Sequence, residues 1–583
     1  MRLYILFLFV FLTGLKSGFS NLIEEKTFID PILMDLLNDQ DIVDCLISFD
    51  RKANVYPAKF LKTKQEKGKF VFDILQKVSV ESQKHILLYL DKEKIDYNSY
   101  YVVNAIAAKL NLDQILAISE FNEVKAIAHN PTVRLEKHIT ENYTLSKELP
   151  EPEWGIKMIQ ADSVWKLGYE GDGVVIGGQD TGFEWEHPVL KNKYRGQNQN
   201  GVDHNYNWHD AIREINEGSE DSINPCGLNS PFPCDDNNHG THTMGTMIGS
   251  DSMNAIGVAP KAKWIACRNM ERGLGKPSTY IECFEWFLAP TNLDGNFPDP
   301  NLAPDVINNS WSCPEDEGCN ETNWEMMEDA IINLKAAGIV VVVSAGNEGR
   351  DGCGTIARPP AMFESSFAIG ATRANDTIAA FSSRGPVLID SSFRLKPDVS
   401  APGHNVRSCV RNGEFNSFSG TSMAGPHVVG AVALIINANP SLRGRVEIIE
   451  NILIETAVNK FADMDCFDFL GQNAPNHVYG AGRINLLKAV ELASVVSSVK
   501  DEIPEPFSFK IYPNPAFDVI NIDASHSQFS DYKISLFNVE GKLLKVKSDS
   551  PKALSLDGLA SGMYVVKLES NMGSAFERLV IGR

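Results

Sequence analysis

The stretch "WEMMEDAIINLKAAGIVVVVSAGN", Trp324–Asn347, decides the fold class of this chain. Its first part, up to Gly338, is typical of a helix, and its second part is a strongly apolar strand that ends at Asn347. A helical segment that leads directly into such a strand is one unit of an α/β pattern. The stretch therefore predicts a sheet that is covered by helices.

The same alternation extends over about residues 154–495. The runs "GVVIGGQDTG", "KWIACRNM" and "DVINNSW" are further apolar, β-rich segments, and "STYIECFEWFL" is a further helical one. Such alternation predicts an α/β fold, a doubly wound parallel sheet with helices on both faces. Reactive residues are then expected at the carboxyl ends of the strands.

Three residue types that serine catalysis needs lie at such positions. A strand runs into Asp180, His239 precedes a helix of small residues, and Ser422 lies just before another helix. A serine hydroxyl becomes a good nucleophile when a neutral imidazole accepts its proton and a buried carboxylate orients that imidazole. Asn347, at the end of its strand, is predicted to hold the oxyanion that forms in the transition state.

Four motifs, "DTG", "HGTHTMGT", "SAGNEG" and "GTSMAGPHVVGAVAL", resemble in this order the subtilisin-like serine proteases (subtilases). The resemblance implies an enzyme, a secreted serine endopeptidase that cleaves proteins or peptides and needs no cofactor for catalysis. It assigns the triad to Asp180, His239 and Ser422 and the oxyanion donor to Asn347. Within the family, "NNSW", "PPA", "FAIGAT" and "FSSRGP" resemble the bacillopeptidase F-like branch.

Substrate contacts are expected beside these residues. Many subtilases have Ser-Leu-Gly-Gly on the strand edge that pairs with substrate, whereas this chain has "SWSC". Backbone pairing with an extended peptide is still expected. Glu348 either favours basic side chains in the specificity pocket or is a solvated rim carboxylate. The predicted substrate-binding residues are Ser310, Trp311, Ser312, Gly346 and Glu348.

Other interpretations of these motifs have less support from the sequence. His239 and His242 have a spacing at which two imidazoles can share a metal, but no glutamate or third ligand accompanies them. We therefore expect His242 to be a hydrogen-bonded structural neighbour of the base. In "GDGVVIGG", Gly171–Gly178, the glycines precede and occupy the strand, so a dinucleotide loop is not expected. A catalytically inactive binding protein on the same fold is the alternative function.

Calcium is a separate question, because family members often bind it for stability. The insertion Tyr194–Asp236 is rich in carboxylates, which are the hard oxygen ligands that calcium prefers. Either a structural calcium site or a solvated acidic loop fits this composition. The acidic residues concerned are Glu214, Glu217, Glu220, Asp221, Asp235 and Asp236.

Residues 21–150 form a separate α+β pattern before the catalytic domain, residues 151–496. "HILLYL", "YYVVNAIAAKL" and "EVKAIAHNPTVRL" are predicted strands, and "NLDQILAISEF" is a predicted helix. The pattern resembles the ferredoxin-like inhibitory propeptide of subtilases. That resemblance implies a domain that assists folding and leaves its tail in the active site. The polar stretch from Glu136 to Pro150 is the predicted cleavable connection.

The C-terminal part of the chain differs in composition from the part before it. Residues 497–506 read as a linker, and residues 507–583 contain short strands separated by turn signals, which predicts a small β-sandwich. "YPNPA" near the start and "LASGMYVVKL" near the end resemble the C-terminal sorting domain of type IX secretion cargo. The secretion machinery is then an expected partner. A carbohydrate-binding sandwich is the alternative, although the strands show no evident aromatic platform.

The first twenty residues predict export. They hold Arg2, the apolar run Leu3–Leu12, and small residues at Gly18 and Ser20, which is typical of a secretory signal peptide at residues 1–20. A membrane anchor is the alternative, but the run is short for a bilayer, and no later stretch of eighteen apolar residues follows. The net charge of −21 argues against a nucleic-acid partner. The expected location is therefore outside the cell or on its surface, without a membrane span.

The chain has ten cysteines, which are expected to pair outside the cytosol. Two short loops predict the bridges Cys226–Cys234 and Cys313–Cys319. Cys45 lies in the segment that we expect to be removed, which leaves nine and hence at least one thiol free or paired outside the chain. The sequence does not assign Cys267, Cys283, Cys353, Cys409 and Cys466.

Overall fold

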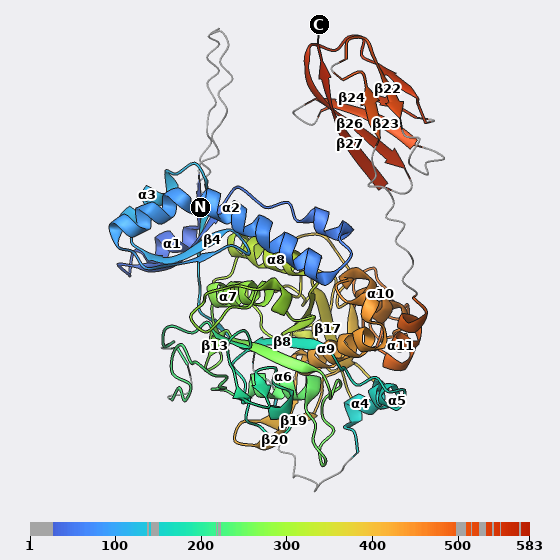
Figure 1. Cartoon of the computed structure of the whole chain (residues 1–583). Helices are drawn as coiled ribbons and strands as arrows, with labels where there is room; N and C mark the ends of the chain where they lie inside the picture. Colours follow the sequence, from blue (N-terminus) through green and yellow to red (C-terminus); the bar gives the residue numbers. More distant parts are fainter. Residues whose placement is uncertain are drawn as a thin grey trace, which may run out of the picture. The chain divides into compact units, whose positions relative to one another are not determined.

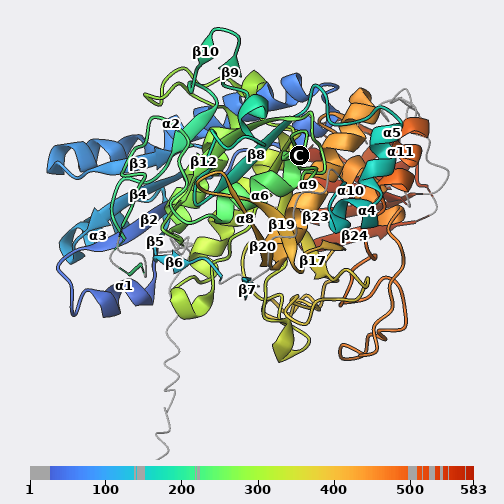
Figure 2. The same ribbon diagram turned by 90° about the horizontal axis from the view of Figure 1, so that it is seen from below.

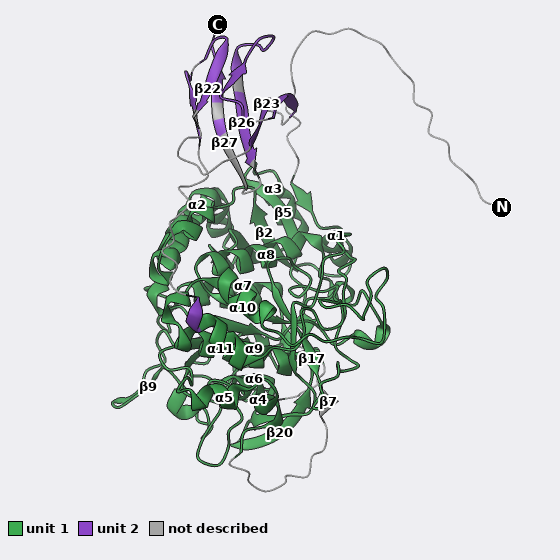
Figure 3. Ribbon diagram, turned by 90° about the vertical axis from the view of Figure 1, so that its right-hand side faces the viewer, with its two compact units in different colours: residues 1–493 green, residues 494–583 purple. Residues whose placement is uncertain are grey.

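The computed structural model describes two compact units, residues 1–493 and 494–583 (Figure 3). The predicted signal peptide and the linker 497–506 lie outside the described residues. The described residues are 27–136, 139–140, 151–216, 218–219, 223–496, 509–514, 516–523, 532–538, 542–548, 550–570 and 573–582.

A seven-stranded sheet forms the centre of the first unit, and all of its strand pairs are parallel. Its strands are short and almost wholly buried, as strands covered on both faces must be. In spatial order they are β11 (Trp208–Asp210), β12 (Lys263–Arg268), β8 (Val175–Asp180), β15 (Val306–Asn309), β16 (Val340–Ser344), β17 (Phe367–Thr372) and β18 (Val399–Pro402).

Helices cover both faces of this sheet (Figure 1). A side chain added at Gly177 of β8 would come within 2.7 Å of Phe287 on α7 (Pro277–Leu288). One added at the next residue, Gly178, would come within 3.0 Å of Met244 on α6 (His239–Ile248). Since successive strand residues face opposite sides, α7 and α6 lie on opposite faces. The predicted doubly wound α/β fold is confirmed.

Helix α8 (Glu321–Ala336) packs beside α7, and α9 (Thr421–Ala438) packs beside α6. Of the described helices, α9 alone is long and apolar enough to cross a membrane, but 89% of it is buried inside the protein. It is a core helix beneath the sheet.

The N-terminal part of this unit is a five-stranded sheet in the order β1-β5-β2-β4-β3. The segments from β2 to β5 run strand, helix, strand, strand, helix, strand, which is the ferredoxin-like arrangement. The elements are β1 (Phe28–Ile29), α1 (Pro31–Leu36), β2 (Val43–Phe49), α2 (Lys64–Glu93), β3 (Tyr97–Tyr100), β4 (Ala105–Leu110), α3 (Leu112–Ser119) and β5 (Val124–His129).

This sheet lies between its own helices and the helices of the parallel sheet. Cys45 and Ile47 of β2 belong to a core with Ile86 of α2. Leu46, between them in the sequence, belongs to the core that contains Tyr280 of α7 and Ile331 of α8. The alternation of β2 thus places α7 and α8 beneath the N-terminal sheet.

Two predicted strands of this segment were wrong. "HILLYL" is the end of α2, in which Ile86 and Leu90 are fully buried four residues apart and Leu88 is 59% exposed, as helical periodicity requires. "YYVVNAIAAKL" is not one strand: its first residue ends β3, the chain then turns up to Asn104, whose φ is 51°, and β4 begins at Ala105. Similarly, "EVKAIAHNPTVRL" is not continuous: β5 ends at His129, and a separate short strand begins after Pro131.

The second unit is a sandwich of two antiparallel sheets, in the orders β21-β22-β25 and β24-β23-β26-β27. Their inner faces share one core that includes Ile520, Leu536 and Val566. Tyr564 is largely buried in this core, whereas Tyr512 is 53% exposed. The strands are β21 (Lys510–Tyr512), β22 (Val519–Asp523), β23 (Tyr532–Asn538), β24 (Leu543–Lys547), β25 (Ala553–Ser555), β26 (Gly562–Ser570) and β27 (Gly573–Ile581).

The remaining elements of the first unit are short and surround the two sheets. The helices are α4 (Trp154–Met158), α5 (Ala161–Lys166), α10 (Val446–Glu455) and α11 (Leu486–Val495). The strands are β6 (Val133–Arg134), β7 (Ile139–Thr140), β9 (Gln197–Asn198), β10 (Gly201–Val202), β13 (Met270–Glu271), β14 (Leu274–Gly275), β19 (Val406–Val410) and β20 (Glu414–Ser419).

Four disulfides link the first unit. The predicted bridges Cys226–Cys234 and Cys313–Cys319 are present. Cys267–Cys283 and Cys353–Cys466 join residues that the sequence did not pair. Cys45 and Cys409 are free and buried.

Candidate active site

Asp180 and His239 meet at the carboxyl edge of the parallel sheet. Asp180 is the last residue of β8, and His239 is the first of α6. The Nδ1 atom of His239 lies 2.7 Å from Oδ1 and 2.9 Å from Oδ2 of Asp180, with both side chains buried. A carboxylate can only accept, so Nδ1 carries the proton in this contact and Nε2 remains the basic nitrogen.

The close approach of α6 to β8 depends on a glycine. A side chain at Gly240 would come within 2.1 Å of the carbonyl oxygen of Gly182 and 3.0 Å of Cβ of Asp180. The backbone N–H of Thr181 also donates to Oδ1 of Asp180 over 2.8 Å. The carboxylate is therefore held in one orientation toward the imidazole.

Asp235 fixes the loop before α6. Its Oδ1 accepts from the hydroxyl of Thr181 over 2.9 Å, and its Oδ2 accepts from the hydroxyl of Thr241 over 2.6 Å. Asp235 was predicted only as one of the possible calcium ligands, and this role in the loop was not predicted. An aspartate shortly before a helix start is the capping signal that could have indicated it.

His242 has different partners from His239. Its Nε2 donates to the carbonyl oxygen of Val406 over 2.9 Å, and its ring stacks on Phe418 with centroids 4.4 Å apart. The two imidazoles therefore do not face a common centre. Within the described part of the chain, no group of three or more His, Cys, Asp or Glu side chains is arranged to hold a metal ion.

The acidic insertion gives no further indication of a calcium site. Glu214 pairs with Lys109 over 2.5 Å and also with Lys276. Asp236 accepts from the backbone N–H of Arg272 over 2.8 Å. Glu217, Glu220 and Asp221 lie outside the described residues.

Ser422 and Asn347 lie at the same edge of the sheet. Ser422 is the second residue of α9 and is 5% exposed. Asn347 follows β16, and its Oδ1 accepts from the backbone N–H of Thr421 over 2.9 Å and from the hydroxyl of Thr421 over 3.1 Å. Because the oxygen is held by Thr421, the amide Nδ2 of Asn347 faces the cleft, where it donates to Oε2 of Glu136 over 2.7 Å.

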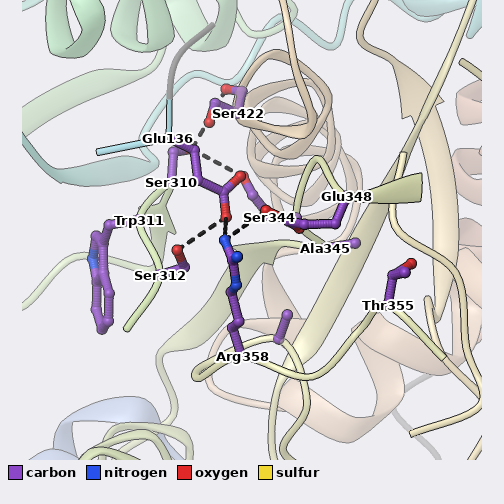
Figure 4. Close-up of a pocket in the computed structure, with 12 residues that line it drawn as sticks. Glu136, Ser310, Trp311, Ser312, Ser344, Ala345, Glu348, Thr355, Arg358 and Ser422 are labelled. Atoms are coloured by element: carbon purple, nitrogen blue, oxygen red, sulfur yellow. Dashed lines mark hydrogen bonds and ion pairs between the residues drawn. The ribbon is translucent and has the colours of Figure 1, made fainter. Parts of the chain in front are cut away.

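A pocket next to Ser422 gathers the residues predicted to bind substrate (Figure 4). It also contains two residues that the sequence analysis did not assign to it, Glu136 and Arg358. Arg358 directly precedes the "PPA" motif but carries no signal of its own. The lining residues include Ser310, Trp311, Ser312, Gly346, Glu348, Arg358, Glu136 and Ser422.

Three charged groups share this pocket. Nη1 of Arg358 lies 2.6 Å from Oε1 of Glu348 and 3.4 Å from Oε1 of Glu136. Burial and the adjacent carboxylate of Glu348 raise the pKa of Glu136 to about 7, whereas Arg358 acts in the opposite direction. The Glu136 side chain therefore occupies a largely desolvated, hydrogen-bonding site.

The chain on both sides of Glu136 pairs with strand edges of the catalytic part. Strand β6, just before it, pairs with β14, and the backbone N–H of Leu135 donates to the carbonyl oxygen of Gly273 over 2.8 Å. Strand β7, just after it, pairs with β20 (Figure 2). The N-terminal segment thus crosses the site as an extended peptide does in β-strand addition.

Comparison with known proteins identifies the family. Residues 171–482 match the sequence profile of the subtilase family. The chain belongs to the subtilase family. The predicted enzyme class, a serine-type endopeptidase, is confirmed at the level of this family.

Relatives of this subtilase are found among bacterial proteases. Bacillopeptidase F of Bacillus subtilis (strain 168) is 37% identical over 497 residues, which are 82% of this chain and 32% of that protein. The match thus spans about a third of that relative's length. Subtilisin E of the same organism is 30% identical over 58% of this chain and 72% of that protein. Subtilisin DY of Bacillus licheniformis is 32% identical over 58% of this chain and 98% of that protein.

The subtilase carries a second domain with its own match. Residues 510–582 match a secretion system C-terminal sorting domain. This finding agrees with the predicted type IX sorting domain. It makes the subtilase a secreted or cell-surface protein.

Proposed function

We propose that this subtilase hydrolyses peptide bonds with Asp180, His239 and Ser422 as its catalytic triad. The observation that carries the proposal is the buried Asp180–His239 pair at the sheet edge to which α9 brings Ser422. Ser422 Oγ bonds to the scissile carbonyl carbon, and His239 accepts its proton. The C–N bond then breaks as His239 passes this proton to the leaving amine, and water hydrolyses the acyl ester by the same path.

Asn347 is the proposed oxyanion donor. Thr421 holds its side-chain oxygen, which supports a preorganised Nδ2–H directed at the cleft. The backbone N–H of Ser422, at the start of α9, is the second donor. Such donors act on the charge that develops in the transition state rather than on bound substrate.

Asn347→Ala is therefore expected to lower kcat by about 10²- to 10³-fold with little change in KM. The reason is that the lost hydrogen bond exists mainly in the transition state. Steady-state kinetics on a peptide amide would measure this split, with thermal unfolding as the check on the fold. An increase in KM at unchanged kcat would contradict the assignment.

We further propose that residues 21–150 act as an inhibitory propeptide, so that the enzyme is made as a zymogen. Three observations support this. The N-terminal sheet packs on α7 and α8, strands β6 and β7 pair across the site, and Oε2 of Glu136 accepts from Nδ2 of Asn347 over 2.7 Å. An occupied oxyanion donor and substrate edge cannot serve another peptide.

The domain plan of the proposal follows from these segments. Residues 1–20 are the signal peptide, residues 151–496 the catalytic domain, residues 497–506 a linker, and residues 507–583 the sorting domain that the secretion machinery recognises. Deleting residues 507–583 is expected to stop export and to leave proteolysis intact. Cell fractionation with a casein assay would measure both, and normal export of the truncated chain would count against this role.

The catalytic proposal is tested by serine-directed phosphonylation of the mature protein together with hydrolysis of denatured casein. Labelling and hydrolysis are both expected. A protein that folds, sheds residues 21–150 and still shows neither would be an inactive binding protein on the subtilase fold.

A further inference from the structure

The pocket beside Ser422 surrounds the Glu136 carboxylate with hydrogen-bond donors (Figure 4). Oε1 of Glu136 accepts from the hydroxyl of Ser312 over 2.9 Å and faces Nη1 of Arg358 at 3.4 Å. Oε2 accepts from Nδ2 of Asn347 over 2.7 Å. Both oxygens are therefore satisfied by side chains of the catalytic part in this resting arrangement. Nδ2 of Asn347 is the donor that the oxyanion requires during the reaction, which leaves Ser312 and Arg358 to recognise the carboxyl group of a substrate.

The position of Glu136 along the chain is equally informative. Buried Val133 lies in β6, which pairs with β14, and Leu135, which is 8% exposed, follows β6 and donates its backbone N–H to Gly273. On the other side, Ile139 pairs in register with Ser419, three residues before Ser422. Glu136 thus lies between the two paired segments with its side chain in the pocket that Ser422 also lines. A residue on the acyl side of a scissile bond would be expected at such a position, next to Ser422 and between two paired segments.

The positive charge in the pocket is held in place by Glu348. The carboxylate of Glu348 binds Arg358 through Oε1 and accepts from the hydroxyl of Ser383 over 2.9 Å through Oε2. A side chain at Gly346, whose φ is 102°, would come within 2.8 Å of this Oε2 atom. Glu348 is therefore already paired with Arg358 and Ser383. Its carboxylate is not available to bind a basic side chain of a substrate.

We infer that Arg358 makes this protease select substrates with glutamate on the acyl side of the scissile bond, over basic and apolar residues. The bond on the carboxyl side of Glu136 is then a substrate of the enzyme itself and is cut by the same acyl transfer. The inference rests on the proposed function, because it assigns specificity to the proposed catalytic site.

The test uses mature protein and peptides Val-Arg-Leu-X coupled to a fluorogenic amine, with X as Glu, Gln, Leu or Lys, at pH 6.5. Active sites are counted by phosphonylation. We expect kcat/KM for Glu to exceed that for Lys by about 100-fold. A preference for Lys or Leu in a protein that is phosphonylated would overturn the inference alone. Absence of phosphonylation would overturn the proposed function and the inference with it.

Arg358→Ala is expected to lower the ratio of kcat/KM for Glu to that for Leu by about 100-fold, because the substrate carboxyl group loses its charged partner. Arg350→Ala is the matched control, since Arg350 is an exposed arginine in the same loop. An unchanged ratio in Arg358→Ala would overturn the role of Arg358. If that variant does not fold, the peptide series on the wild type still decides the preference.

The same peptides give a second readout through pH. The pKa of glutamate rises from 4.5 to about 7 in the pocket, through burial and the carboxylate of Glu348, with Arg358 opposing the shift. A raised pKa means that the neutral form binds more tightly. The advantage of Glu over Gln is thus largest below pH 4.5, falls as the pH rises to 7, and is flat above it.

Between pH 5 and 8 the ratio of kcat/KM for Glu to that for Gln is expected to fall by at least tenfold. Any effect of pH on the catalytic groups acts on both peptides and cancels in the ratio. Glu348→Gln removes one cause of the shift and should flatten the profile. A ratio that rises with pH would contradict the contact between the substrate carboxyl group and Glu348.

The third readout is the maturation product. Mass spectrometry of the protein shortly after folding is expected to find a fragment that ends at Glu136. Glu136→Lys in the full chain should slow the appearance of this fragment at least tenfold. Equal rates for Glu136 and its lysine variant would overturn the inference.

Discussion

Replacing Ser422 with alanine is expected to lower the peptidase activity by about 10⁶-fold, which is the loss that serine triads show when the nucleophile is removed. The reason is that this change removes the hydroxyl that bonds to the scissile carbonyl carbon, and the neighbouring Ser310 is not placed to replace it. Ser310, which lies close by, donates to the carbonyl oxygen of Ser422 over 3.4 Å and is accordingly committed to the backbone. The variant should therefore show neither an acyl ester nor phosphonylation.

The same variant should also keep its N-terminal segment. If the enzyme cuts its own chain, Ser422→Ala remains a full-length precursor when produced alone, whereas wild type is shortened. Gel mobility and phosphonylation measure the two effects together. Ser441→Ala is the matched control, because Ser441 is an exposed serine just after α9. Equal labelling of wild type and Ser422→Ala would show that another residue is the nucleophile.

Replacing His239 with alanine is expected to lower kcat by about 10⁶-fold, nearly as much as Ser422→Ala, because the serine then lacks its proton acceptor. His242→Ala provides a sharp comparison within the same helix. That change removes the hydrogen bond to Val406 and the stacking on Phe418. We expect it to lower the free energy of unfolding by about 2–4 kcal/mol while activity per folded molecule stays within about tenfold of wild type.

Thermal unfolding and active-site titration separate these two effects. His239→Ala should be inactive per folded molecule, whereas His242→Ala should unfold earlier than wild type and remain active when folded. A metal shared by the two histidines would predict the same loss for both variants. Equal losses of activity in the two variants would contradict the division of roles.

The sequence was informative where function depends on local geometry. Asp180 ends a strand and His239 and Ser422 begin helices, so each could be placed at the sheet edge from the pattern around it. Cys226–Cys234 and Cys313–Cys319 were predictable for the same reason, because short loops bring their cysteines together. The apolar run "HILLYL" misled because six residues cannot distinguish a strand from the last turns of a long helix.

Contacts between distant segments were not predictable. Arg358 and Glu136 are separated by 222 positions, and only the packing of the N-terminal sheet on α7 and α8 brings the tail into the pocket. Glu348 was predicted to line the pocket, but its ion pair with Arg358 was not predicted. A charged side chain takes its role from the charges around it, and those come from other loops.

The sequence by itself determined the fold class, the family and the residues of the proposed triad, because these follow from periodicity and from short motifs at element ends. Only the tertiary structure decided which charges share the pocket beside Ser422. Electrostatic interactions act through space and weaken with distance and with solvent, so the charge that Glu348 presents depended on the placement of Arg358.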